Sequence, residues 1–143
     1  MQHGRERGGA RVGHQRARPL HQRGDAVGAA HAQPLEGDAA YVGMEIQVLD
    51  SEHPKWATLQ PYQYHGSVYG VYPAKRGYLL PAGNWNKEEI NVKGSRVKVT
   101  LNGTLILDYD LKTAIKEGTA DHRPHPGLTN KTGHIGFLGH GDV

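Results

Sequence analysis

The chain has 143 residues, a formal net charge of +3 and no cysteine. Its length suits one domain of ordinary size, and the lack of cysteine excludes disulfides and thiolate metal sites. No apolar run is long enough to span a bilayer, so we expect no membrane-spanning helix. The opening residues, MQHGRERGGARVGH, lack the apolar core of a signal peptide, and we therefore expect no secretion signal in this sequence.

The first 33 residues differ in composition from the rest. They hold six arginines and two acidic residues but no lysine and no aromatic residue, whereas residues 34–143 carry a net charge of −1. Their large apolar side chains are only Met1, Val12, Leu20 and Val27, too few to offset the entropy of ordering the backbone, so we expect disorder. Three interpretations stay open: an arm that binds nucleic acid, a solvated tail, or an out-of-frame translation of GC-rich DNA. We favour the last and expect no nucleic-acid partner.

From residue 34 onward the sequence has the pattern of short β-strands. Alternating or β-branched runs predict strands over residues 42–50, 67–72, 89–93, 96–101, 104–109 and 134–138. Asn102-Gly103 predicts a type I′ hairpin turn, because both central positions of that turn need positive φ. Residues 111–116 form the one short helical pattern. Strands separated by Gly, Asn and Pro indicate an all-β fold, an antiparallel β-sandwich.

Five segments appear in an order that resembles a known family. They are PLEGDAAYVGMEIQVLD, YQYHGSVYGVYPAK, GNWNKEEINVKGSRVKVTLNGTLILD, HPGL and GHIGFLGHGD. In this order they resemble the 3-keto-disaccharide hydrolase domain family over about residues 34–143. The resemblance implies a concanavalin-like jelly roll whose members act on glycosides carrying a ketone at glucose C3, some by removing the C2 proton and expelling the C1 substituent before water adds.

The resemblance also implies a location outside the cytoplasm, periplasmic or secreted. Two family features have no counterpart in the sequence: Trp-rich strands before the first matched segment, and a final strand after the HGD near the C-terminus. We therefore expect a sandwich that is incomplete at both ends, with exposed strand edges that favour low stability, aggregation or self-association.

The chemistry that the family implies needs a base beside C2 and a positive group near the developing enolate. Glu45 and Gln47 are the strongest candidates, Glu45 as the base and Gln47 as a substrate-binding residue. They alternate with Met44, Ile46 and Val48, so they should leave their strand on the non-core face. An ordinary solvated strand face is the alternative for this pattern.

Three histidines are further candidates. His134 (catalytic) and His140 (substrate-binding) lie six residues apart, on one face of an unbulged strand and among glycines, although gap-filling histidines in a glycine-rich turn are the alternative. His65 (catalytic) lies between tyrosine-rich stretches. No cofactor is certain, but Glu45 and His134 are weak candidates for holding a divalent metal ion, since carboxylate and imidazole suit several metals.

Lys75, Trp85 and Asn86 complete the set of substrate-binding candidates. Lys75 is a candidate cation for the enolate, and Trp85 and Asn86 could stack on and hydrogen-bond a sugar ring. Plain solvation of the lysine and a core role for the tryptophan are the alternatives. The leading function is an enzyme acting on 3-keto-glycosides or 3-keto-disaccharides, and the alternative is a carbohydrate-binding module that has the same fold without the chemistry.

Overall fold

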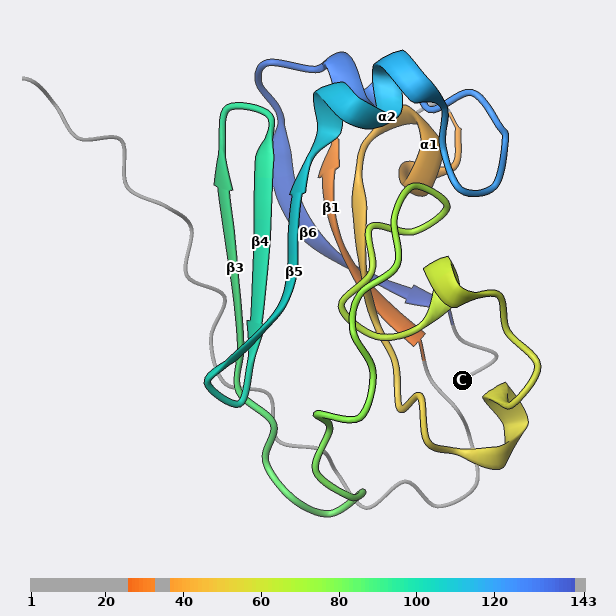
Figure 1. Cartoon of the computed structure of the whole chain (residues 1–143), viewed down its shortest axis with the longest axis vertical. Coiled ribbons are helices and arrows are strands. Elements are labelled where there is room, and N and C mark those ends of the chain that lie inside the picture. Colours follow the sequence, from red (N-terminus) through yellow and green to blue (C-terminus); the bar gives the residue numbers. More distant parts are fainter. Residues whose placement is uncertain (1–25, 33–36, 141–143) are drawn as a thin grey trace, which may run out of the picture.

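The computed structural model describes residues 26–32 and 37–140 of the chain, which form two three-stranded antiparallel sheets (Figure 1). The first sheet has the order β2-β1-β6, with β1 at Ala26–Ala32, β2 at Glu45–Val48 and β6 at His134–His140. The second has the order β3-β4-β5, with β3 at Glu88–Lys93, β4 at Arg96–Leu101 and β5 at Thr104–Asp110.

Strand β1 corrects the boundary expected at residue 33. It pairs along its whole length with β6 and along part of its length with β2, so Ala26–Ala32 is the central strand of its sheet. The sequence AVGAAHA has no alternation of large apolar and polar residues, and for this reason its pattern did not indicate a strand. The predictions for residues 1–25 and 33 lie outside the described residues.

The second sheet follows the predicted strands closely. Asn102 and Gly103 have φ values of 49° and 84°, as a type I′ turn requires, and this confirms the predicted hairpin between β4 and β5. Helix α2 (Leu111–Glu117) follows directly, and its N-cap Asp110 accepts a hydrogen bond of 3.0 Å from the Lys112 N–H. The helix ends at Gly118, whose φ of 99° suits glycine.

The long connection between β2 and β3 contains short helical turns and no strand. The turns are η1 (Pro54–Trp56) and η2 (Pro61–Gln63). The predicted strand at 67–72 is wrong: Val68 makes isolated bridges to Ile46 and to Tyr72, and between those bridges the chain turns at Gly70, which has a φ of 73°. A four-residue helix, α1 (Ala39–Val42), and the turn η3 (Pro126–Thr129) were not anticipated either.

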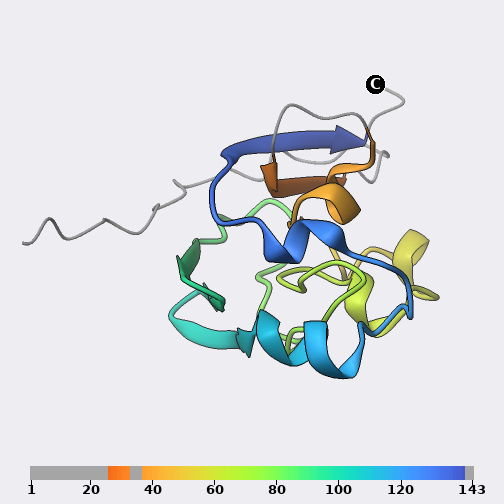
Figure 2. The same ribbon diagram turned by 90° about the horizontal axis from the view of Figure 1, so that it is seen from above.

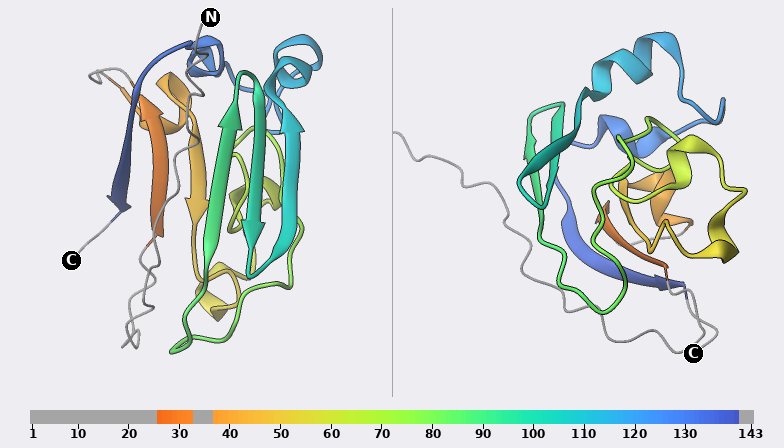
Figure 3. Two further views of the ribbon diagram at one scale, coloured as in Figure 1. Left: turned by 90° about the vertical axis from the view of Figure 1, so that its left-hand side faces the viewer. Right: turned by 60° about the horizontal axis from the view of Figure 1, so that its bottom comes forward.

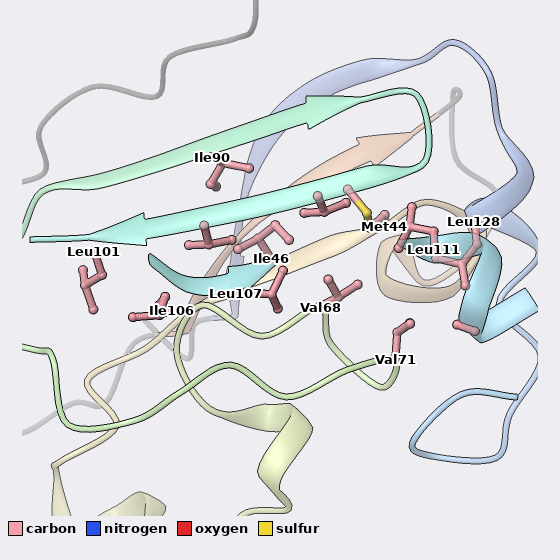
Figure 4. Packing of buried hydrophobic residues seen from close by; sticks show 13 residues of the cluster. Met44, Ile46, Val68, Val71, Ile90, Leu101, Ile106, Leu107, Leu111 and Leu128 are labelled. Atoms are coloured by element: carbon pink, nitrogen blue, oxygen red, sulfur yellow. The ribbon is translucent and has the colours of Figure 1, made fainter. Parts of the chain in front are cut away.

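Both sheets contribute to one hydrophobic core (Figure 4). Ile46 of β2, Val97 and Val99 of β4 and Ile106 of β5 are at most 2% exposed. Full burial of a Val or Ile side chain stabilises the folded state by about 1.5–3 kcal/mol relative to leaving it exposed. Figure 2, seen from above, places β6 and β1 on one side of the molecule and β5 and α2 on the opposite side.

The fold is therefore mostly β, with antiparallel sheets and few helices, as the sequence predicts. Strands of the two sheets run along a similar direction in the left view of Figure 3. In the described residues, none of the helices combines the length and the apolar character needed to cross a bilayer.

Candidate functional site

A small hollow lies against the non-core face of β2. Because side chains alternate along a strand, Ile46 packs into the core while Glu45 and Gln47 leave the opposite face. That face is covered: Glu45 is 3% and Gln47 6% exposed, and both line a hollow of about 220 Å³. The predicted alternation is thus present, and the two side chains lie at the bottom of a small hollow whose rim is partly exposed.

The segment after η2 builds one wall of the hollow by pairing with the second edge of β2. The N–H of Gln47 donates to the Ser67 carbonyl at 3.0 Å, and the N–H of Tyr69 donates to the Glu45 carbonyl at 3.0 Å. Residues that face each other across such a pair point to the same side. Tyr69 therefore lines the hollow beside Glu45, while Val68 faces the core with Ile46.

The Tyr69 hydroxyl is oriented by a short chain of hydrogen bonds. The Gln60 N–H donates to Oε1 of Gln63 at 2.9 Å, and this contact fixes which end of the Gln63 amide is the oxygen. Nε2 of Gln63 then donates to the Tyr69 hydroxyl oxygen at 3.0 Å. Since that contact uses the hydroxyl as an acceptor, its own proton is available to donate to a bound molecule.

Trp56 lines the same hollow from η1, and sequence reasoning missed it. Lys55 places its ammonium 4.7 Å from the centre of the Trp56 ring. Nε1 of Trp56 and Oε1 of Gln47 are buried, and neither has a hydrogen-bond partner among the described residues. The sequence did contain an indication of this role: Trp56 lies in the loop that directly follows the strand with the two predicted site residues, Glu45 and Gln47.

Helix α1 closes one side of the hollow through Asp38 and Ala40. Asp38 caps the helix by accepting a 3.0 Å hydrogen bond from the Ala40 N–H. His125 holds the helix in place: Nδ1 lies 3.3 Å from the Ala40 carbonyl oxygen, and the imidazole packs against the Tyr41 ring at a centroid distance of 4.6 Å. His125, which looks like a loop filler in sequence, thus positions a wall of the hollow.

Asp121 anchors the other nitrogen of His125. Its two carboxylate oxygens lie 3.0 and 3.1 Å from Nε2 of His125. Burial alone would raise the pKa of Asp121, but hydrogen bonds from the Arg123 N–H, His125 and the Thr119 hydroxyl outweigh burial and lower the pKa. The carboxylate is therefore held in its charged form beside the histidine.

His65 lies behind the hollow. Its Nδ1 accepts a 3.2 Å hydrogen bond from the Leu49 N–H, so the neutral ring carries its proton on Nε2 and has no lone pair left to act as a base. Nε2 lies 3.6 Å from Oε1 of Glu88, and the two atoms have no hydrogen-bond partner among the described residues. Burial lowers the pKa of His65 to about 4 and raises the pKa of Glu88 to about 7. The contact has the spacing of an ion pair, but both shifts favour the neutral forms, so we treat it as a weak polar contact.

Three further candidates, Lys75, Trp85 and Asn86, lie in the connection between β2 and β3 and do not line the hollow. Lys75 is exposed and borders, with His65, a crevice of about 10 Å³, at most the size of one water molecule. Trp85 is 47% exposed and lies in the loop before β3. Asn86 is structural: its Oδ1 accepts from the Leu80 N–H and from Nδ2 of Asn102, each at 2.8 Å, and these contacts tie the loop to the β4–β5 turn.

The register of the first sheet places His134 on the same face as Glu45. Ala30 of β1 faces both Glu45 and Gly136, and His134 is two residues before Gly136. However, β1 separates the two strands by about 10 Å, and the exposed His134 does not line the hollow. His140 pairs with Ala26 on the same face, at the other end of β6, but its side chain lies outside the described part.

Metal binding by Glu45 and His134 stays a prediction. Among the side chains that the structure describes, those of residues 37–139, no group of three or more His, Asp or Glu is arranged to hold a metal ion. The separation of the two residues across β1 gives no pair of ligands pointing at one position.

The chain thus combines a β-rich fold with a small hollow lined by acidic, amide and aromatic side chains. The chain belongs to the 3-keto-alpha-glucoside-1,2-lyase-like domain family, whose model matches residues 19–143 and so begins before residue 34. No match was found among curated proteins.

Two crystal structures of proteins assigned as glycosyl hydrolases from Parabacteroides distasonis ATCC 8503 are similar in fold. One has a TM-score of 0.64 and 25% identity, and the match covers 83% of this chain and 69% of that one. The other has a TM-score of 0.66 and 24% identity, and covers 82% and 60% respectively. The chain thus spans 60–69% of the length of these structures. Family and fold together support a glycoside-processing function.

Proposed function

We propose that this chain is the core of an enzyme domain that acts on 3-keto-glycosides, with Glu45 as the general base. The observation that carries the proposal is the position of Glu45. Glu45 belongs to a strand that is paired on both edges, is 3% exposed, and lines a hollow together with Asp38, two glutamines and two aromatic residues.

The lining, which includes the carboxylates of Asp38 and Glu45, suits a ligand without negative charge. Among the described residues around the hollow there is no Lys, Arg or His, and aromatic faces lie next to amide groups, as in many sugar sites. The volume of about 220 Å³ is below the roughly 300–1,000 Å³ of sites that hold larger ligands. The hollow therefore fits a single sugar ring, with the second part of a glycoside outside.

The proposed reaction is an elimination. A ketone at C3 acidifies the C2 proton, which Glu45 removes. The electron pair of the C2–H bond first passes onto the C3 oxygen, which gives an enolate. As the enolate collapses, a C1=C2 double bond forms while the C1–O bond breaks, and the departing oxygen takes up a proton. Water then adds across this double bond, with its oxygen on C1 and a proton on C2, and this completes a net hydrolysis. The Tyr69 hydroxyl proton, left available by the Gln63 contact, is a donor for charge developing on the sugar.

We also propose that the two sheets are the layers of a concanavalin-like jelly roll. The contributions of β2, β3, β4 and β5 to a single core support this arrangement.

The reaction is tested by NMR in D₂O with a 3-keto-glucoside. We expect release of the C1 substituent and deuterium at C2 of recovered substrate, because proton abstraction precedes release. Binding without release or exchange would favour a carbohydrate-binding module instead. Absence of both binding and turnover would contradict the proposal.

A further inference from the structure

We infer that Trp56 and Gln47 together recognise a keto group and a hydroxyl next to it. Trp56 donates a hydrogen bond to the ketone oxygen, and Gln47 accepts one from the hydroxyl. This inference rests on the proposed function. Its basis is that both side chains line the hollow and that each carries a buried polar atom without a hydrogen-bond partner in the described part of the chain. Buried polar atoms are nearly always paired, so two unpaired ones at a single hollow need an explanation.

The two atoms are chemically complementary. Nε1–H of Trp56 can only donate a hydrogen bond, whereas Oε1 of Gln47 can only accept one. A ketone oxygen can only accept, so within this pair it fits Trp56 and not Gln47. A hydroxyl on a neighbouring carbon can donate to Gln47. A ring with a ketone beside a hydroxyl presents this combination.

The two contacts have different consequences for the reaction. Removal of the C2 proton moves negative charge onto the ketone oxygen, so a hydrogen bond from Trp56 becomes stronger in the transition state. The hydroxyl held by Gln47 carries no new charge. Trp56 therefore acts on turnover, and Gln47 on binding alone.

The two unpaired atoms must become accessible for these contacts to form. Gln47 is 6% exposed, and both unpaired atoms are closed off from solvent. Trp56 lies on η1, in the connection that passes over β2, and its only described ring partner is Lys55, its sequence neighbour. We expect η1 to shift when a sugar enters, and this shift changes the surroundings of the indole.

The experiment compares Trp56→Phe, Gln47→Met and Trp85→Phe with the wild type on a 3-keto-glucoside. We expect W56F to lower kcat about 100-fold, as for loss of one donor to a developing oxyanion, and Q47M to raise KM about tenfold with kcat within about threefold. W85F changes the other tryptophan, which lies outside the hollow: a fall in kcat for W56F that exceeds any change in W85F assigns the donor role to Trp56. Thermal melting of each variant separates loss of fold from loss of function.

The W85F chain also serves as a reporter, because Trp56 is then its single tryptophan. Addition of the 3-keto-glucoside should change its fluorescence, and this readout does not require turnover. A folded W56F and Q47M with wild-type constants and wild-type affinity would overturn the inference while leaving the proposed function intact. If the wild type neither binds nor converts the ketone, the proposed function itself fails.

Discussion

Gly70 lies so close to His125 that a Cβ on Gly70 would be 2.7 Å from Cε1 of His125 and 2.5 Å from Oδ2 of Asp121. The turn at Gly70 follows the segment that builds one wall of the hollow, and His125 positions helix α1 at another wall. The close approach of these two residues therefore joins two walls of the candidate site.

Gly70→Ala should destabilise the fold by at least about 2 kcal/mol. It adds a steric overlap with His125 and Asp121 to the cost of a φ of 73° in a residue with a side chain. Gly77→Ala is the matched control, since Gly77 has a φ of 89° and no atom within 4 Å of the added Cβ. Urea unfolding measures both; equal losses for the two variants would show that the contact with His125 has no energetic weight.

The pair of His65 and Glu88 makes two opposing contributions to the pH dependence of stability. Between about pH 4.5 and 7 the folded state holds a proton on Glu88 that the unfolded state releases, so this group makes stability fall as pH rises. Between about pH 4 and 6.5 the unfolded state holds a proton that buried His65 lacks, so this group makes stability rise with pH. The two trends oppose each other over most of this range.

Glu88→Gln should remove one of the two trends. As the pH rises from 4.5 to 7, the wild type loses stability through Glu88 and the variant does not. The unfolding free energy of the variant should therefore rise relative to that of the wild type, by up to about 3 kcal/mol at pH 7. Glu89→Gln, an exposed neighbour on the same strand, is the control and should follow the wild type. Chemical denaturation at several pH values is the measurement, and parallel curves for E88Q and the wild type would contradict the prediction.

The apolar face of β6 predicts self-association. Ile135 and Phe137 are 56% and 58% exposed, and Ile135 lines a groove of about 950 Å³ that β3 and α2 also border. Phe137→Glu should shift the chain toward the monomer in sedimentation or light-scattering experiments. Leu105→Glu, at an exposed position on β5, is the control. A wild-type chain that is monomeric at high concentration would contradict the prediction.

Local patterns predicted much of the fold. The alternation in β3, β4 and β5 and the Asn102-Gly103 turn identify the second sheet, because these signals depend on adjacent residues. Strand β1 lacked such a signal, since small residues occupy most of its positions and its place in the sheet depends on pairing with distant β2 and β6.

The candidate site was predicted only in part. Glu45 and Gln47 were identified because alternation fixes the face from which they leave β2. Trp56 and Gln63 reach the hollow through the irregular connection after β2, whose path no periodic pattern specifies. His65, placed in the site by its tyrosine-rich surroundings, faces Glu88 instead, because the chain next to β2 turns its side chain toward β3.

The most direct test of the account is the effect of Glu45→Gln on a 3-keto-glucoside. The substitution keeps size and shape but removes the base, so kcat should fall by about 100-fold or more while the dissociation constant measured by calorimetry stays within about threefold. A folded E45Q chain that releases the C1 substituent at the wild-type rate would contradict the central claim.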